Sequence, residues 1–236
     1  MIAENLETIR RRMGLACSRS GRDPASVTLV VVAKTFPADR VLEAVRAGAL
    51  DIGENYVQEL AAKRAALAGE PVRWHFIGHL QRNKVRQVVP WVAMIHAVES
   101  EPLAKSIDEK ARAAGQVADI LLEVNTTGES TKYGVAPEAV LPLVRRLERL
   151  GSVRLAGLMT IGPFLPDPEG SRPMFRQLRE LRDRVRELGQ ANAPMHHLSM
   201  GMTGDFEVAI EEGATLIRIG TAVFGPRKKP VKEYGL

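Results

Sequence analysis

Lys34 has the clearest chemical potential in this chain, because it directly follows the pattern of a buried strand. Residues 27–33 read VTLVVVA, and a turn signal, Thr35-Phe36-Pro37, comes after the lysine. A continuous β-branched run between turn signals is typical of a strand buried on both faces of a parallel sheet. A lysine at the end of such a strand loses its proton easily and becomes an amine nucleophile, which suits imine formation with a carbonyl compound. The alternative interpretation is a lysine whose ammonium reaches water from the strand end.

Two segments near the end of the chain have the composition of an anion site. One is Ser199-Met200-Gly201-Met202-Thr203-Gly204, and the other is Arg218-Ile219-Gly220-Thr221. Hydroxyl groups, bare backbone at glycine and the free N–H groups of a helix start together form a phosphate cradle. Either segment taken alone is better explained as a turn, because Gly, Ser and Thr are common loop and cap residues.

Arg218 adds a second chemical constraint. It alternates with Ile217 and Ile219, so on a strand its side chain points to the opposite face from theirs. If the bound compound contains a pyridine ring, a guanidinium beside the ring nitrogen would donate a hydrogen bond and keep its own proton. The pyridine ring would then stay neutral. The alternative is an arginine paired with an acid such as Glu54 or Glu207.

These residues must be positioned by an alternation of strand and helix patterns along the chain. Strands are expected at residues 28–33, 50–53, 73–77, 94–98, 120–125, 154–159, 196–200 and 216–220. Helices are expected at residues 39–47, 57–67, 82–89, 102–114, 137–150, 171–188 and 203–212, preceded by an extra helix at 3–19. Strict alternation of strands and helices requires a parallel sheet, and eight strands favour closure of that sheet into a barrel. The expected fold is therefore a single (β/α)₈ TIM barrel over residues 1–236, an α/β fold with an extra N-terminal helix. An open doubly wound sheet is the alternative.

The residues at the two ends of the expected strands differ in polarity. Those that follow the strands are mostly polar or glycine, whereas those that precede them are mostly small or apolar. Barrels of this class carry their chemistry at the carboxyl ends of the strands and most often bind phosphate after strands seven and eight. A lysine after strand one and anion segments after strands seven and eight therefore indicate a phosphorylated carbonyl compound.

Composition excludes several classes of protein. The chain has 236 residues, of which 45% are hydrophobic, 26% charged and 5% aromatic, and its net charge is +5. The single cysteine, Cys17, excludes a disulfide framework and fits a reducing compartment. The charged N-terminus has no apolar core of signal-peptide length and no segment approaches a membrane span, so a cytoplasmic protein is expected. Only the basic isoelectric point of the chain and the basic residues 227–229 suggest nucleic-acid binding, and no specific nucleic acid is expected.

Histidine spacing suggests no metal site. His75 and His79 have a metal-binding spacing for a helix, but here they lie on a strand and at its exit. His196 and His197 are adjacent, so on a strand they point to opposite sides. No metal is expected.

A series of motifs resembles the pyridoxal phosphate homeostasis proteins, a family similar to the N-terminal barrel of alanine racemase (fold type III). The matching motifs are Val32-Ala33-Lys34-Thr35, Gly53-Glu54-Asn55-Tyr56-Val57-Gln58-Glu59, Trp74-His75-Phe76-Ile77-Gly78-His79-Leu80-Gln81, Asn83-Lys84, Val124-Asn125, Lys132-Tyr133-Gly134, Gly157-Leu158-Met159-Thr160, Leu198-Ser199-Met200-Gly201-Met202 and Arg218-Ile219-Gly220-Thr221. They follow one another over nearly the whole chain and are specific only when taken together. Thr203 stands where the family often has Ser, and Tyr133 follows the loop lysine Lys132.

The resemblance implies a cofactor and a set of residues that bind it. Lys34 would form a Schiff base with pyridoxal 5'-phosphate (PLP), and Arg218 would face the pyridine nitrogen. The resemblance further implies that the phosphate is held by Ser199, Gly201, Gly220 and Thr221, and that Asn55 and Met159 line the ring pocket.

The resemblance leaves the choice between a carrier and an enzyme to be argued. A racemase of this fold has a second domain that supplies a second base, and only about sixteen residues follow Gly220. We therefore expect a monomeric protein that buffers PLP and delivers it to apo PLP-dependent enzymes. The alternative is a one-domain PLP-dependent enzyme, a weak racemase or decarboxylase, in which His79, Tyr56 or Lys132 acts as the acid. Lys132 is also a candidate second amine for handing over the aldehyde.

Overall fold

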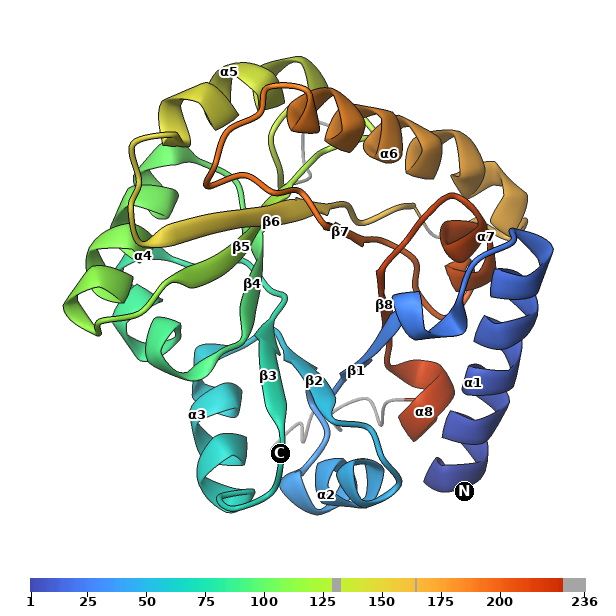
Figure 1. Cartoon of the computed structure of the whole chain (residues 1–236). Helices are drawn as coiled ribbons and strands as arrows, with labels where there is room; N and C mark the ends of the chain where they lie inside the picture. Colours follow the sequence, from blue (N-terminus) through green and yellow to red (C-terminus); the bar gives the residue numbers. More distant parts are fainter. Residues whose placement is uncertain (129–132, 164, 227–236) are drawn as a thin grey trace, which may run out of the picture.

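The computed structural model shows a closed barrel of parallel strands surrounded by helices, and it describes residues 1–128, 133–163 and 165–226 (Figure 1). The strands are β1 (Thr28–Val32), β2 (Asp51–Glu54), β3 (Arg73–Phe76), β4 (Met94–Val98), β5 (Ala118–Glu123), β6 (Val153–Met159), β7 (His197–Ser199) and β8 (Leu216–Ile219). They pair in chain order, and β8 closes the ring on β1. The TIM barrel expected from the alternating pattern is thus confirmed, and the open sheet is excluded.

Helices follow the strands around the outside of the ring. The α-helices are α1 (Ile2–Arg19), α2 (Ala38–Arg46), α3 (Val57–Ala66), α4 (Glu101–Ala113), α5 (Pro137–Leu147), α6 (Arg172–Arg186), α7 (Phe206–Glu211) and α8 (Thr221–Phe224). Short 3₁₀ helices are η1 (Pro24–Ser26), η2 (Arg82–Gln87), η3 (Val89–Trp91) and η4 (Pro168–Ser171). None of the described helices is both long and apolar enough to cross a membrane.

Two expected helices differ from the structure. Where a helix was expected at 82–89, two 3₁₀ segments form at 82–87 and 89–91, because Pro90 restricts the conformation of Val89 and interrupts the helical ladder. The helix expected at 203–212 begins only at Phe206. Asp205 closes a turn before it, since its carboxylate accepts the Met202 N–H at 2.7 Å.

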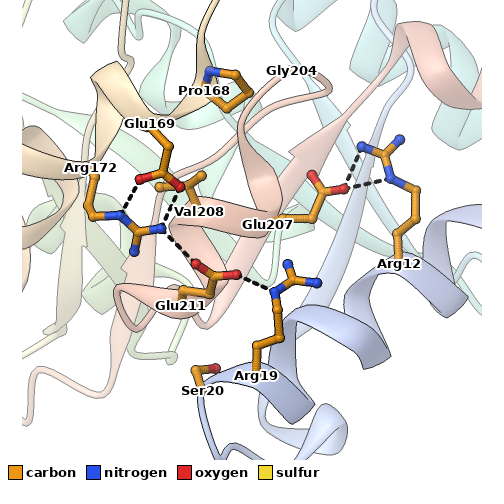
Figure 2. A pocket seen from close by; sticks show the side chains of 10 residues that line it. All are labelled: Arg12, Arg19, Ser20, Pro168, Glu169, Arg172, Gly204, Glu207, Val208 and Glu211. Carbon is orange, nitrogen blue, oxygen red and sulfur yellow. Dashed lines mark hydrogen bonds and ion pairs between the residues drawn. The ribbon is translucent and has the colours of Figure 1, made fainter.

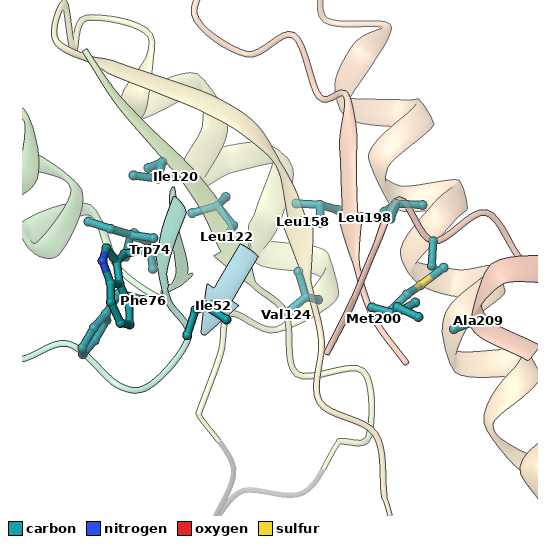
Figure 3. Packing of buried hydrophobic residues seen from close by; sticks show 14 of the residues in the cluster. Ile52, Trp74, Phe76, Ile120, Leu122, Val124, Leu158, Leu198, Met200 and Ala209 are labelled. Atoms are coloured by element: carbon teal, nitrogen blue, oxygen red, sulfur yellow. The ribbon is translucent and has the colours of Figure 1, made fainter. Parts of the chain in front are cut away.

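The core lies mainly between the sheet and the helices. Outward-facing strand residues such as Ile52, Phe76, Ile120 and Leu198 are buried there (Figure 3). At roughly 25 cal/mol per Å² of buried apolar surface, this layer supplies most of the hydrophobic stabilisation.

The extra N-terminal helix packs on the last helices of the ring. α1 contacts α7 and α8 and lies beside them in Figure 1. Its buried residues Ile2, Leu6, Ile9 and Met13 recur every three or four positions and so form one apolar face. α1 thereby covers the barrel where the chain closes it.

The inner face of the barrel has a second, smaller apolar cluster. Its members are Val30, Met94, Ala97, Leu121, Ala156, Met159 and Leu216. The register pairs Val30 with Arg218 across β1 and β8, so both residues belong to the inner face. Ile217 and Ile219 belong to the outer layer, which confirms that Arg218 points to the opposite side.

Candidate functional site

Lys34 lies just beyond β1, at the carboxyl end of the barrel, and its side chain is half-buried. It lies in the turn that follows β1, two residues after the inner-face position Val32. β1 pairs Val32 with Gly53, so Lys34 and Asn55 each lie two residues beyond a paired position, at the same end of the barrel. On its other side, the β1–β8 register carries Val32 to Gly220. The predicted amine, amide and glycine therefore share one end of the barrel.

A buried charge cluster holds the turn that carries Lys34. Lys63 of α3 donates hydrogen bonds to the Ala33 carbonyl at 2.7 Å, to Glu54 at 2.5 Å and to Glu59 at 2.8 Å. Glu59 in turn accepts the N–H of Thr35 at 2.8 Å. Thr35 has a φ of 68°, a left-handed conformation that costs a threonine about 1 kcal/mol or more and needs such support. Sequence analysis missed Lys63, and its only local signal was the Glu59–Lys63 spacing of four on a helix.

The pKa values of this cluster follow from burial and pairing. Burial raises the pKa of Glu54 above its ordinary 4.5, although the Lys63 ammonium opposes that shift. The pKa of Glu59 is lowered, because hydrogen bonds from Lys63 and Thr35 outweigh its burial. The Lys63 amine is thus engaged by the carboxylates of Glu54 and Glu59, whereas Lys34 lies at the barrel mouth.

Arg218 is held at the bottom of the mouth by two neighbours. Its Nη1 donates to Ser199 Oγ at 2.5 Å and its Nη2 donates to the Thr160 carbonyl at 2.8 Å. Burial lowers the pKa of Arg218 from 12.5 to about 10, so the guanidinium remains charged at neutral pH. The alternative pairing with Glu54 or Glu207 is wrong, because Glu54 binds Lys63 and Glu207 binds Arg12.

Asn55 and Met159, the residues predicted to line a ring pocket, lie just beyond the carboxyl end of β2 and at the carboxyl end of β6. Asn55 Oδ1 is buried and has no hydrogen-bond partner among the described residues, so it is an acceptor awaiting a donor. A Cβ at Gly78 would lie 2.4 Å from the Asn55 carbonyl oxygen, so only glycine lets β3 leave the barrel so close to Asn55. Met159 ends β6, is fully buried and belongs to the inner apolar cluster. Together they offer an apolar surface and one unsatisfied polar atom.

The residues predicted to bind a phosphate have different local environments in the structure. Gly220 lies beside β1, where an added Cβ would come within 3.2 Å of the Val32 carbonyl, and the exposed Thr221 begins α8. The first N–H groups of a helix have no acceptor inside it, so this backbone suits an anion. Gly201 is required by its φ of 92° and by Ala209, whose Cβ would lie 2.6 Å from an added Cβ. Its carbonyl accepts the Arg218 N–H at 3.0 Å, which joins the two anion segments side by side.

Ser199 has a different environment from the other three. It is fully buried, and its hydroxyl contacts Arg218 Nη1 at 2.5 Å and His96 Nδ1 at 2.9 Å. Both contacts lie inside the barrel. The Ser199 side chain therefore contacts Arg218 and His96, and its role in phosphate binding stays a prediction.

Glu123 is a mouth residue that sequence analysis did not select. It ends β5 and is buried. Burial and the nearby Glu99 raise its pKa from 4.5 to about 7, although Arg218 opposes the shift. A glutamate at a strand end was visible in the sequence, but its low exposure was not.

Several histidines of the described chain contact other side chains of the protein. His75 Nε2 lies 3.0 Å from Asp51 and His75 Nδ1 lies 3.0 Å from His96 Nε2, inside the barrel. His79 pairs with Glu99 at 3.3 Å and stacks on Tyr133 at 4.4 Å between ring centroids. Among the described residues no group of histidine, cysteine or carboxylate side chains is arranged to hold a metal ion. The pairing of His75 with His96 is the contact that sequence spacing missed.

A second hollow lies outside the barrel between α1, η4 and α7 (Figure 2). Its charged groups already satisfy one another: Glu207 binds Arg12 at 2.5 Å, and Glu211 binds Arg19 and Arg172, each at 2.7 Å. It contains none of the inner-face residues described above, so we assign the site to the barrel mouth. Two features singled out in the sequence lie outside the described residues: Lys132 and the basic stretch 227–229.

Comparisons with known proteins agree with this geometry. The family described as "Alanine racemase, N-terminal domain" matches residues 2–228. The chain is 45% identical over 225 residues to the pyridoxal phosphate homeostasis protein of Aquifex aeolicus, covering 95% of this chain and 98% of that protein.

Solved structures extend the comparison to three dimensions. The structure of PipY of Synechococcus elongatus PCC7942 with PLP bound is 34% identical, has a TM-score of 0.83, and matches 95% of this chain and 100% of that one. Alanine racemase of Clostridium difficile 630 shares the fold, with a TM-score of 0.72 at 14% identity. That match covers 96% of this chain and 58% of the racemase chain.

Proposed function

The chain belongs to the family of pyridoxal phosphate homeostasis proteins, and from this premise we propose that it binds PLP in the barrel mouth and takes part in the homeostasis of this cofactor. The observation that supports the proposal is that Lys34, Asn55 and Gly220 lie at the carboxyl end of the barrel, above the inward-facing Arg218. An amine, a ring-nitrogen donor and an anion-binding backbone are the three features that recognise a phosphorylated pyridine aldehyde.

Lys34 supplies the amine for a Schiff base. PLP supplies an aldehyde that condenses with a neutral amine, forming a C=N bond and releasing water. Lys34 is half-buried at the carboxyl end of the barrel, where its amine would meet the aldehyde. The Lys63 cluster fixes the turn on which Lys34 sits.

The other mouth residues bind and orient the ring. Arg218 would donate a hydrogen bond to the ring nitrogen, and because a guanidinium does not release its proton, the ring nitrogen would stay unprotonated. Asn55 Oδ1, which has no partner among the described residues, would accept a hydrogen bond from the cofactor, and Met159 would supply apolar surface for the ring. The backbone at Gly201, Gly220 and Thr221 would hold the phosphate, and Ser199 would act through its hydrogen bond with Arg218.

The first experiment tests covalent binding. Purified protein is incubated with PLP, desalted, and followed by its visible absorbance before and after borohydride. The expected result is a visible band that borohydride removes, with a reduced adduct mapped by mass spectrometry to Lys34. Lys34→Ala should lose the band, and Lys105→Ala, an exposed lysine paired with Glu101 on α4, should keep it. A Lys34→Ala variant that binds as much reducible PLP as the wild type would contradict the proposal.

The second experiment tests delivery. PLP-loaded protein, freed of unbound cofactor, is mixed with the apo form of a PLP-dependent enzyme, and recovery of that enzyme's activity is compared with an equal concentration of free PLP. We propose that the protein hands over its PLP, so activity should return in the mixture. If the cofactor stays on the protein and amino acids are instead racemised or decarboxylated at enzyme-like rates, the enzymatic alternative is correct.

A further inference from the structure

A continuous line of polar side chains crosses the inside of the barrel beneath the proposed ring site. Asp51 contacts His75 at 3.0 Å, His75 contacts His96 at 3.0 Å, and His96 contacts Ser199 at 2.9 Å. The line ends where Ser199 contacts Arg218 at 2.5 Å. All five residues are buried, and they come from β2, β3, β4, β7 and β8.

The direction of every hydrogen bond in this line follows from its two ends. Arg218 only donates, and an ionised Asp51 only accepts. If both imidazoles are neutral, His75 Nε2–H must donate to Asp51, so His75 Nδ1 accepts from His96 Nε2–H. His96 Nδ1 then accepts the Ser199 hydroxyl proton, and Ser199 Oγ accepts from Arg218. This is the only assignment that satisfies all four contacts with neutral rings.

An extra proton on either ring would break the line. A second proton on His75 or on His96 turns His96 Nδ1 into a donor toward Ser199. Ser199 Oγ would then receive two donors, and its own proton would have no acceptor among these side chains. A buried unsatisfied hydroxyl is costly, so the structure favours neutral rings.

The charges around the line agree with that assignment. Burial, and with it the positive charge of Arg218, lower the pKa of His96 well below 6.5. Burial would raise the pKa of Asp51, but hydrogen bonds from His75 and Arg73 outweigh it and keep the carboxylate ionised. One end of the line is therefore anionic, the other is cationic, and His96 between them is held neutral.

We propose that Ser199, His96, His75 and Asp51 form a one-directional relay that positions the Arg218 guanidinium under the bound ring. Ser199 binds Nη1 while the Thr160 carbonyl binds Nη2 at 2.8 Å, which fixes the guanidinium plane. The four are positioning residues, since only Arg218 is directed at the ligand. This inference rests on the proposed PLP site for its consequence, but the relay itself exists without the ligand.

The relay is tested first on protein without added PLP, by nitrogen NMR of the histidine rings at neutral pH. The expected result is that His75 and His96 are both neutral, each with a protonated Nε2 and an unprotonated Nδ1. A doubly protonated ring, or a protonated Nδ1 on either residue, would overturn the proposal. This measurement does not depend on PLP binding, so a failure of the proposed function leaves its outcome readable.

The second test follows PLP binding in variants that cut the line. His96→Phe and Ser199→Ala should each weaken PLP binding by about tenfold, as expected for the loss of one buried hydrogen bond, and should shift the visible absorbance maximum. His96→Gln keeps an acceptor for Ser199 and a donor for His75, so it should restore both readouts. The matched control is His197→Phe, a histidine of β7 that contacts Thr215 and lies outside the line.

The outcomes separate the two proposals. If the wild type takes up no PLP, the proposed function fails while the ring assignments still decide the relay. If the wild type binds PLP and His96→Phe or Ser199→Ala matches it in affinity and spectrum, the relay has no positioning role. An affinity loss that His96→Gln fails to restore would indicate lost packing alone and would also overturn the proposal.

Discussion

The two faces of the barrel sheet are both buried, yet they differ in chemistry. The outer face packs against the helices in a layer of large apolar side chains, and its charged groups, such as Lys63 and Glu54, are paired. The inner face has only a small apolar cluster, and a line of polar side chains crosses it. An outer layer of this size can support the free energy of folding, which allows the inside of the barrel to be arranged for binding.

The difference has a geometric cause. Inward-pointing side chains from alternate strand positions meet in a narrow space, where a few residues decide whether it is apolar or polar. Outward-pointing side chains meet helices that can each present several apolar residues. Substitutions on the two faces should therefore affect stability and binding differently.

The largest loss of stability is expected in the outer layer. Phe175 of α6 is almost fully buried, and Phe175→Ala should lower the free energy of unfolding by up to about 5 kcal/mol through lost burial and a cavity. PLP bound per folded molecule should not change, because Phe175 is remote from the inner face. Denaturant unfolding with a parallel PLP titration checks both, and Phe175→Leu should lose less. If Phe175→Ala lost PLP affinity as strongly as it lost stability, the proposed separation of roles between the outer and inner faces would be wrong.

A paired charge in the outer layer should be nearly as sensitive. Lys63→Met leaves Glu54 buried without its cation and should cost about 4 kcal/mol. It also frees the turn around Lys34, so PLP uptake should fall as well. The matched variant is Lys63→Met with Glu54→Leu, which should recover stability without restoring the contact to the Ala33 carbonyl. A single variant as stable as the wild type would show that this pair is dispensable.

A smaller, pH-dependent effect is expected in the barrel mouth. The pKa of Glu123 is about 7 in the folded protein, above its ordinary 4.5, so the folded state holds this proton more tightly than the unfolded chain. Stability contributed by Glu123 is therefore complete below pH 4.5 and is lost as the pH rises through 7, by about 3 kcal/mol at most. Glu123→Gln should remove this dependence and be more stable than the wild type at pH 8. Urea unfolding of PLP-free protein at several pH values measures it, and an unchanged pH profile would show that Glu123 titrates normally.

The smallest effect is expected on the surface. Arg12 and Glu207 form an ion pair in the hollow beside α1, where both side chains are partly exposed (Figure 2). Arg12→Gln should change the free energy of unfolding by about 0.5 kcal/mol, and less at high salt. Thermal unfolding at low and high salt measures this contribution. A loss above about 2 kcal/mol would show that the Arg12–Glu207 pair stabilises the protein as much as a buried ion pair does.

Sequence patterning was sufficient for the elements and for the directions of several side chains. The β-branched run before Lys34 and the alternation around Arg218 depend only on neighbouring residues, so they predicted a strand end and an inward-pointing arginine. Local turn chemistry was harder: Asp205 closes a turn that delays α7 to Phe206, because a short side chain competed with the helical ladder.

Only the tertiary structure decided which distant side chains meet. His75 and His96 are separated by 21 residues, and Ser199 is 103 residues from His96, yet closure of the barrel brings them into one line. Which inward-pointing residues touch depends on the stagger of eight paired strands, a property of the closed sheet that no local window contains. For the same reason Lys34 and Arg218 were predictable as individual groups, while the contacts that hold them were not.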